Sequence, residues 1–362
     1  MRIVTPGLVL DQPRTLPRLE EVVIDDPGAG EVRVRLIASG VCHTDISAVR
    51  DARFWPMLLG HEGSGIVESV GSDVRHVKAG DPVLISWKVS CGRCHNCLRH
   101  LPHLCEQVVA TAEPRVHRPN GERLHVMLNA GTFCEYCVVP ADGAIPIQQP
   151  INLEAASIIG CAVATGVGAA IHTADLHAGE TCVIFGVGGV GLNIVQGARL
   201  AQAGMIIAVD VTESKLAAAR QMGATHTIDA NQGDPVQAVL ALTGGRGVDY
   251  AFEVVGTPAI MTQALATLAP GGALIVVGAA ARDAQLSFLP RSFMSKQQRI
   301  LGCIYGGCHP PVDFPQFVDW YAAGQIKVDE LVTEYIRLDD VVKCFTEASA
   351  PDAIRTVIRF GE

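Results

Sequence analysis

The chain has 362 residues, of which 49% are hydrophobic and 18% charged, and it carries a net charge of -9. This length exceeds a single compact core of ordinary size, so two domains are expected. The acidic balance, without any cluster of Lys and Arg, argues against a nucleic-acid-binding surface.

The N-terminal segment MRIVTPGLVLDQP has no apolar run of useful length before proline and charge interrupt it, so no secretory signal is predicted. The chain also has 12 cysteines. Without an export signal, a reducing cytoplasm is the expected compartment, and the thiols are expected to be metal ligands or core residues, not disulfides.

Residues 31–150 contain short apolar segments separated by Gly, Pro and Asp, which is typical of an all-β domain with long loops. The segments are VRVRLIASG, GIVESVG, DPVLIS and FCEYCVVP. The last one contains a C-x2-C pair, Cys134 and Cys137. Side chains three apart on a strand face opposite sides, so packing is predicted for this pair and a shared metal is not.

Four cysteines follow the spacing C-x2-C-x2-C-x7-C in the irregular stretch SCGRCHNCLRHLPHLC. They are Cys91, Cys94, Cys97 and Cys105. Two-residue spacers fold successive thiolates around one tetrahedral zinc, whereas two disulfides or unconnected thiols suit such short steps less well. Four thiolates leave no open position, so this site is predicted to be structural. The neighbouring His95, His100 and His103 are then loop side chains and not ligands.

Residues 155–174 form an uncharged stretch of about membrane-spanning length. Gly, Thr, Ser and His interrupt it, and a charged turn with glycine follows. A buried segment beside a cleft is therefore predicted, and no association with a membrane.

After Asn152, apolar strands alternate with glycine turns and helices, which predicts a parallel, doubly wound sheet. One turn, Gly186-Val187-Gly188-Gly189-Val190-Gly191, matches G-x-G-x-x-G between an apolar strand at 181–185 and a helix that begins near Val190. Its glycines allow the backbone to approach a pyrophosphate at the positive end of that helix. The alternative is a glycine turn that binds nothing.

Asp210 supports the dinucleotide interpretation, because it ends the next strand about 20 residues beyond the glycines. It is predicted to accept hydrogen bonds from both ribose hydroxyls and to repel a 2′-phosphate, which favours NAD over NADP. Lys215, on the following helix, either contacts the adenosine ribose or is a solvated surface residue.

The last part of the chain predicts a helix over 313–323, another near 339–348 and a final strand, AIRTVIRF. This tail is expected to return to the first domain. The predicted domains are residues 1–162, 163–304 and the returning segment 305–362.

Three further residues suggest a second metal site: Cys42 in GVCHTD, His61 in GHEG, and Cys161 at the seam between the two domain patterns. Two thiolates and an imidazole would leave a fourth position open for water or substrate, as a catalytic zinc requires. Spacing alone does not bring these residues together.

These motifs together resemble the zinc-dependent medium-chain alcohol dehydrogenase family over essentially the full length of the chain. The resemblance rests on CHTD, GHEGSG, the four-cysteine lobe, GCAVATGVGAA, GVGGVG with its downstream Asp, and AIRTVIRF. It implies a GroES-like catalytic domain, a Rossmann coenzyme domain, NAD and two zinc ions per chain. It also implies hydride transfer between an alcohol and NAD, and a homo-oligomer, either a dimer or a tetramer.

The resemblance also implies roles for particular residues. The implied zinc ligands are Cys42, His61 and Cys161 at the catalytic site and Cys91, Cys94, Cys97 and Cys105 at the structural site. Glu62 matches the acid beside the zinc histidine, Asp45 matches the residue that holds that histidine, and Thr44 matches the hydroxyl that touches the alcohol. The implied coenzyme contacts are His43 and Arg355 for the phosphates, Thr165 for the nicotinamide, and the backbone around Cys303 and Tyr305 for the carboxamide.

Trp87 matches a position that lines the substrate pocket, although a core tryptophan is the alternative. With Phe54 and Trp55 as further apolar wall, it favours primary aliphatic, allylic or benzylic alcohols. Where many relatives have a histidine that ends the proton relay, this chain has Ser47, so water or another group is expected there. A thiol-adduct (S-hydroxymethyl) formaldehyde dehydrogenase is the enzymatic alternative, and a non-enzymatic zinc-binding scaffold is the second.

Overall fold

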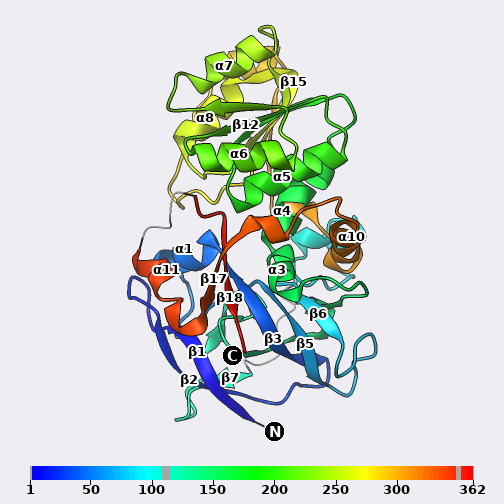
Figure 1. The fold of residues 1–362 in the computed structure, drawn as a ribbon, viewed down its shortest axis with the longest axis vertical. Helices are drawn as coiled ribbons and strands as arrows, with labels where there is room; N and C mark the ends of the chain where they lie inside the picture. The colour runs from blue at the N-terminus through cyan, green and yellow to red at the C-terminus, as the bar shows by residue number, and fades with distance from the viewer. Residues whose placement is uncertain (1, 108–114, 348–351, 362) are drawn as a thin grey trace. The chain divides into compact units, whose positions relative to one another are not determined.

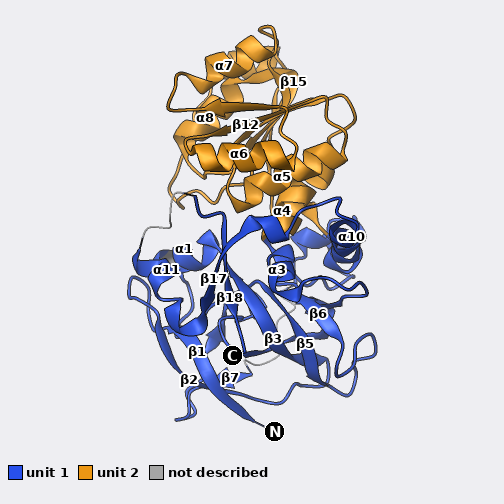
Figure 2. Ribbon diagram, viewed as in Figure 1, with its two compact units in different colours: residues 1–161, 309–362 blue, residues 162–308 orange. Residues whose placement is uncertain are grey.

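A computed structural model describes residues 2–107, 115–347 and 352–361. The chain divides into two compact units (Figure 2): Met1–Cys161 together with His309–Glu362, and Ala162–Cys308. The sequence predicted domain boundaries after residues 162 and 304. The later division after Cys308 has a local reason, because the Cys308 thiol donates a hydrogen bond to Ala164 O, 3.2 Å away, within the second unit.

The first unit is built mainly of antiparallel strands. One of its sheets has the order β7-β2-β1-β4-β8, and another has the order β10-β6-β5-β3-β18-β17, with β9 also paired to β3. The strands are β1 (Ile3–Leu10), β2 (Arg18–Ile24), β3 (Glu31–Val41), β4 (Met57–Leu58), β5 (Gly63–Val70), β6 (Pro82–Ile85), β7 (Val116–His117), β8 (His125–Val126), β9 (Tyr136–Pro140), β10 (Ala144–Pro146), β17 (Val332–Arg337) and β18 (Arg355–Arg359). The α-helices are α1 (His43–Asp51), α2 (His95–Leu98), α3 (Leu153–Ala156), α10 (Pro310–Ala322) and α11 (Lys343–Thr346).

Strand β3 is the centre of the larger sheet, since it pairs with β5, β9 and β18. Its alternate residues Val32, Val34 and Leu36 are buried in one hydrophobic core, as the period of two in VRVRLIASG requires. Because β18 comes from the end of the chain and pairs antiparallel with β3, the C-terminal segment is part of this unit.

Two features of the first unit differ from the sequence prediction. The hairpin of β1 and β2 was not predicted, because Pro6 and Gly7 interrupt the apolar pattern of β1. The single helix predicted near 339–348 is wrong: the chain forms a 3₁₀ turn, Leu338–Asp340, and the short α11, after which Glu347 adopts an extended backbone. Residue 348 lies outside the described residues.

The second unit is a parallel sheet in the order β13-β12-β11-β14-β15-β16, so the predicted doubly wound architecture is confirmed (Figure 1). Its strands are β11 (Thr181–Phe185), β12 (Met205–Asp210), β13 (His226–Asp229), β14 (Val248–Glu253), β15 (Leu268–Val276) and β16 (Arg299–Gly302). Its α-helices are α4 (Ala162–Gly168), α5 (Gly189–Leu200), α6 (Glu213–Met222), α7 (Pro235–Leu242), α8 (Pro258–Ala266) and α9 (Pro290–Ser295).

Local sequence signals fix the ends of these helices. Helix α6 stops at Gly223, whose φ of 118° lies in the region that favours glycine. Helix α7 starts after Asp234, whose side chain accepts a hydrogen bond from Val236 N, and Pro235 occupies its first turn. These caps set the connections between successive strands of the sheet.

Among the described residues, no single helix is long and apolar enough to cross a membrane. The segments Leu153–Gly160 and Ala162–Thr173 meet that criterion only as a bent pair.

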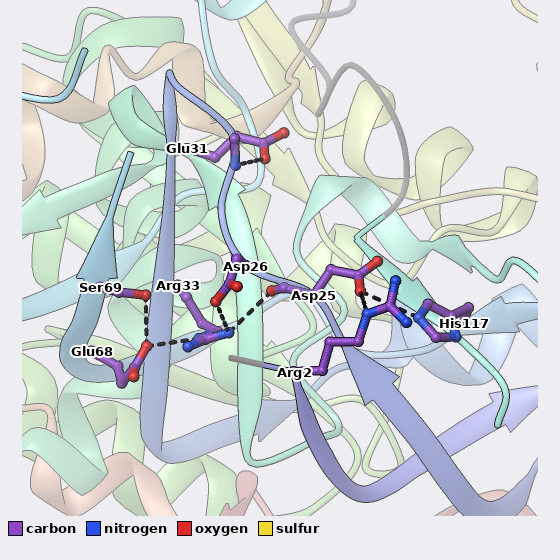
Figure 3. A network of polar contacts seen from close by, with 9 residues as sticks. Arg2, Asp25, Asp26, Glu31, Arg33, Glu68, Ser69 and His117 are labelled. Carbon is purple, nitrogen blue, oxygen red and sulfur yellow. Dashed lines mark hydrogen bonds and ion pairs between the residues drawn. The ribbon is translucent and has the colours of Figure 1, made fainter. Parts of the chain in front are cut away.

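A buried arginine joins three segments of the first unit (Figure 3). Arg33, on β3, is 3% exposed; it donates hydrogen bonds to Glu68 Oε2 at 2.7 Å and to Asp26 Oδ1 at 3.1 Å. It also reaches the backbone oxygen of Asp25 at 3.3 Å. Asp25 in turn pairs with Arg2, which is 71% exposed. The two arginines of this network therefore differ mainly in burial.

We expect Arg33→Met to lower the free energy of unfolding of the first unit by about 1–2 kcal/mol, because Glu68 and Asp26 lose a buried donor, although both carboxylates are exposed enough to rehydrate. Arg2→Met, in the same network but exposed, should cost less than about 0.5 kcal/mol. The three tryptophans, Trp55, Trp87 and Trp320, all belong to the first unit, so urea unfolding followed by tryptophan fluorescence reports on it. Equal losses for the two variants would contradict this ranking.

Candidate functional site

Four side chains with metal-binding atoms gather in the first unit. They are Cys42, His61, Glu62 and Cys161; all are buried, and their ligand atoms lie within 4.8 Å of one another. Cys42 precedes α1, His61 lies between β4 and β5, and Cys161 follows the 3₁₀ turn Ser157–Gly160. The fold thus brings together the three predicted ligands, which are distant in sequence.

Two glycines make room for this cluster. Gly60 has a φ of +91°, and a Cβ there would lie 2.4 Å from Phe133 N, so only glycine permits the turn that leads into His61. A Cβ on Gly40 would lie 2.2 Å from Glu62 Oε2. The glycines of the GHEG and GVCHTD motifs are therefore required for packing around the cluster, in addition to the ligands that these motifs supply.

Asp45 ties two of the ligands together. One of its carboxylate oxygens accepts a hydrogen bond from Cys42 N at 2.9 Å, and the other lies 2.9 Å from His61 Nδ1. The carboxylate therefore fixes the ring orientation of His61, with Nε2 directed away from Asp45. Within the described residues, the buried Nε2 atom has no hydrogen-bond partner.

The donor set fits a zinc ion. The interaction with Cys161 lowers the pKa of Cys42 well below its ordinary value, so one thiol of the pair is readily deprotonated. Burial alone would lower the pKa of His61, but Asp45 and Cys42 raise it well above the usual value, which reflects a negatively charged pocket. Two sulfurs, one imidazole nitrogen without a partner and surrounding negative charge are the chemistry that a divalent cation requires.

Glu62 and Arg355 form a buried ion pair beside the cluster. Arg355, on β18, donates a hydrogen bond to Glu62 Oε2, and the side chains of both residues are at most 6% exposed. Burial raises the pKa of Glu62 to about 7, and Arg355 opposes that rise. The other oxygen of Glu62 is 3.9 Å from His61 Nε2. The sequence placed Arg355 at a coenzyme phosphate; here its guanidinium contacts Glu62, and the phosphate role stays a prediction.

The other predicted metal cluster is also assembled. Its four thiols, from Cys91, Cys94, Cys97 and Cys105, lie within 4.8 Å of one another. The Cys91 and Cys97 sulfurs are 4.0 Å apart, and those of Cys94 and Cys105 are 3.9 Å apart. Tetrahedral zinc with bonds of about 2.3 Å would separate its sulfurs by about 3.8 Å. All four cysteines are free, so they form no disulfides.

The other cysteine pair is divided between two cores. Cys134 and Cys137 are buried in different hydrophobic clusters, which agrees with the prediction that they face opposite sides. Burial raises the pKa of Cys134 to about 12, so it is a neutral core thiol. The histidines near the four-cysteine lobe, His95, His100 and His103, do not belong to its cluster.

Helix α1 carries three further predicted residues. His43 and Thr44 open the helix and are exposed, so their side chains are accessible to ligands. Ser47, one turn later, donates a hydrogen bond from its hydroxyl to His43 O at 3.0 Å. The hydroxyl thus bonds to the helix backbone, and the expectation that Ser47 does not act as a base stays a prediction.

Trp87 lies next to the metal cluster. Its ring is 6.5 Å from that of His61, edge to face, and the side chain is half-buried. Phe54 and Trp55 are 64% and 46% exposed, and the Phe54 ring packs 5.4 Å from His125. Trp87 therefore has a structural link to the site, whereas a pocket role for Phe54 and Trp55 stays a prediction.

The glycine-rich loop of the second unit has the expected strand-turn-helix context. The loop consists of Gly186, Val187, Gly188, Gly189, Val190 and Gly191, between β11 and the first turn of α5. A Cβ on Gly191 would lie 2.0 Å from Gly186 O, so the turn closes too tightly for any side chain there. Gly188, the N-cap of α5, offers no side-chain cap to the first N–H groups of the helix.

Asp210 is held at the end of β12 by backbone hydrogen bonds. One oxygen accepts from Val187 N at 2.9 Å, and the other accepts from Val211 N at 2.8 Å and Thr212 N at 3.0 Å. The acid is therefore fixed beside the glycine loop. Lys215 lies in the first turn of α6 and is half-buried.

Three other predicted coenzyme residues lie elsewhere in the second unit. Thr165 is half-buried in α4, Tyr305 is buried in a 3₁₀ turn, and Cys303 follows β16 and accepts a hydrogen bond from Thr173. The sequence prediction missed Glu253, a buried carboxylate at the end of β14. The signal was an acid directly after the apolar residues 250–252 of the strand VDYAFE.

Comparison with known proteins agrees with this geometry. Residues 28–149 match the family described as alcohol dehydrogenase GroES-like domain, and residues 189–323 match the family described as zinc-binding dehydrogenase. The chain is 36% identical to alcohol dehydrogenase 6 of Peromyscus maniculatus, with 97% of this chain and 96% of that protein covered. It is also 36% identical to S-(hydroxymethyl)glutathione dehydrogenase of Paracoccus denitrificans, with coverage of 94% and 95%.

Among solved structures, benzyl alcohol dehydrogenase of Acinetobacter calcoaceticus is similar, with a TM-score of 0.90 and 29% identity. The similarity covers 99% of this chain and 100% of that one. The predicted GroES-like and Rossmann-type folds are thereby confirmed. The chain is an enzyme that belongs to the zinc-dependent medium-chain alcohol dehydrogenase family.

Proposed function

We propose that the protein oxidises primary alcohols to aldehydes with NAD, and reduces aldehydes in the reverse direction. The observation that carries this proposal is the buried set of Cys42, His61 and Cys161, in which His61 Nε2 has no hydrogen-bond partner in the described part of the chain. Two thiolates and an imidazole form the ligand set of catalytic zinc in alcohol dehydrogenases, which leaves one position for substrate.

Bound zinc supplies Lewis acidity, and bound nicotinamide supplies a hydride acceptor. The residues of this chain orient the groups and move the proton. Asp45 holds both the Cys42 backbone and the His61 ring, so two ligands keep a fixed geometry. Thr44, exposed at the start of α1, would accept the alcohol proton while its own hydroxyl proton passes on to water. Ser47 would not end this relay because a serine hydroxyl is a weak base.

The choice of NAD rests on Asp210. Its carboxylate is fixed by three backbone N–H groups, so it cannot turn away from a ribose hydroxyl without losing them. A 2′-phosphate at the same place would put like charges side by side. Lys215, on the next helix, is proposed to contact the adenosine ribose.

The substrate class rests on Trp87. The Trp87 ring lies 6.5 Å from that of His61, and its bulk is proposed to disfavour a second carbon branch beside the alcohol carbon. This favours primary aliphatic, allylic or benzylic alcohols, and the similarity to a benzyl alcohol dehydrogenase supports the benzylic class. The similarity to S-(hydroxymethyl)glutathione dehydrogenases favours a second candidate, a thiol adduct of formaldehyde.

Two further features bear on the proposed assembly and location of the protein. Strand β16 ends the sheet of the second unit, and its free edge suits a dimer or tetramer joined through this edge. None of the 12 cysteines forms a disulfide, which is compatible with the proposed reducing cytoplasm.

Primary and benzylic alcohols should reduce NAD, with kcat/KM for secondary alcohols lower by about tenfold or more. The assay uses zinc-replete protein, a panel of alcohols and aldehydes, NAD or NADP, and formaldehyde with and without glutathione. A strong preference for NADP would contradict the argument from Asp210. Activity only with formaldehyde and glutathione would select the second candidate, and no activity on any compound would refute the dehydrogenase proposal.

Thr44→Ala should reduce kcat by about 10²-fold, because it removes a proton-transfer group. Ser47→Ala is the matched control on the same helix; it should stay within about twofold of the wild type, since its hydroxyl bonds only to the backbone. Steady-state kinetics with a saturating alcohol measure both. If the serine variant lost as much activity as the threonine variant, the assigned proton route would be wrong.

The purified protein should hold two zinc ions per chain, one at each cluster. Cys161→Ala and Cys97→Ala should each lose one, because each removes a ligand from a different site. Cys137→Ala, at a buried cysteine outside both clusters, should retain two. Elemental analysis by mass spectrometry measures the content, and loss of zinc from the Cys137 variant would show that the assignment of ligands is wrong.

A further inference from the structure

Glu253 occupies a special point of the parallel sheet. It ends β14, where its backbone lies beside Phe185 of β11 on one side and Val276 of β15 on the other. The strand after β11 in the sequence, β12, lies on the opposite side of β11, so the connections diverge between β11 and β14. Ligands of open α/β sheets bind at the carboxyl ends of strands at such a switch point.

The Glu253 side chain fastens the turn that follows it. The residue is fully buried, and its Oε1 accepts hydrogen bonds from Val255 N at 2.9 Å, Gly256 N at 2.7 Å and Thr257 N at 3.5 Å. Thr257, the N-cap of α8, makes no side-chain cap of its own. One carboxylate oxygen therefore takes up three successive N–H donors before the helix.

This arrangement has a cost. Oε2 of Glu253 is buried and has no hydrogen-bond partner among the described residues. Burial raises the pKa of Glu253, although the three N–H groups oppose that rise. Because an exposed Ser or Asp could cap a helix without burying a carboxylate, the cost calls for a reason beyond capping.

The turn packs closely against two neighbouring turns, and glycines at the contacts make this close packing possible. A Cβ on Gly186, the first glycine of the predicted dinucleotide loop, would lie 2.7 Å from Val255 Cγ2. A Cβ on Gly278, after β15, would lie 2.3 Å from Gly256 N. The turn thus touches the glycine loop on one side and the next turn on the other, while the Val255 side chain is 52% exposed at this edge of the sheet.

From these contacts we infer that Glu253 is a positioning residue for dinucleotide binding: it holds residues 254–257 as the wall against which the glycine loop is shaped. It acts through the turn and does not itself contact the dinucleotide. The inference rests on the proposed use of a dinucleotide at Gly186–Gly191. Without the carboxylate, the turn has to be ordered when the dinucleotide binds, so affinity falls more than the rate at saturation.

The test compares three variants of the full-length protein by titration with NADH. Glu253→Leu should weaken NADH binding by about tenfold, since hydrogen bonds to a charged acceptor are lost. Glu253→Gln should stay within about threefold, because the amide oxygen still accepts from the turn. Asp249→Leu is the matched control: Asp249 lies at the other end of β14, accepts from Thr181 N and Oγ1, and should leave NADH affinity unchanged.

Two further measurements separate positioning from general loss of structure. Amide hydrogen exchange at residues 255–257, without any ligand, should be faster in Glu253→Leu and not in Asp249→Leu. KM for NAD should rise in Glu253→Leu, while kcat at saturation stays within about twofold. If Glu253→Leu does not fold, Glu253→Asp replaces it. A carboxylate shortened by one methylene keeps the charge but no longer reaches the N–H groups of the turn. Glu253→Asp should therefore weaken NADH binding, whereas Glu253→Gln should not.

Equal NADH affinity for the wild type and a folded Glu253→Leu or Glu253→Asp variant would overturn the inference. A Gln variant as weak as the Leu variant would also overturn it, because charge and not the backbone acceptor would then matter. A wild type that binds neither NADH nor NADPH is a different result, which would refute the dinucleotide function and the inference together.

Discussion

The buried cluster of Cys42, His61 and Cys161 depends on one carboxylate that bonds in two directions. Asp45 accepts from the backbone of Cys42 and lies against the ring of His61, so it joins the start of α1 to the connection between β4 and β5. The pairing of β3 with β5 already brings these segments together, and Asp45 adds a direct link between the two ligands. A buried, fully bonded carboxylate is a rigid way to do this, because each bond restricts the other.

Buried charge around the cluster is balanced by the end of the chain. Glu62 lies beside the ligands, and without Arg355 it would be an uncompensated buried acid among thiols. Arg355 arrives on β18, which is anchored by its pairing with β3. The return of the C-terminal segment to the first unit therefore contributes a counter-charge as well as a strand.

The features that the sequence predicted best depend on the spacing of residues that are close together in the chain. The four-cysteine lobe and the glycine loop depend on neighbours within a few residues, so the sequence patterns were sufficient. The pairing of Glu62 with Arg355 depends on residues almost 300 positions apart, which no spacing rule links. Glu253 was missed for a similar reason, because its role depends on which strands lie beside β14. The β1–β2 hairpin was missed because Pro6 interrupts the apolar pattern of β1.

The order in which the chain is synthesised has a consequence for the larger sheet of the first unit. Residues 38–41 of β3 are made before the second unit, but their partners on β18 are made only after it. The second unit, residues 162–308, is complete before that and has its own core, so it can fold first. A nascent chain stalled before β18 would therefore display thiols and Glu62 without their counter-charge, next to an open strand edge.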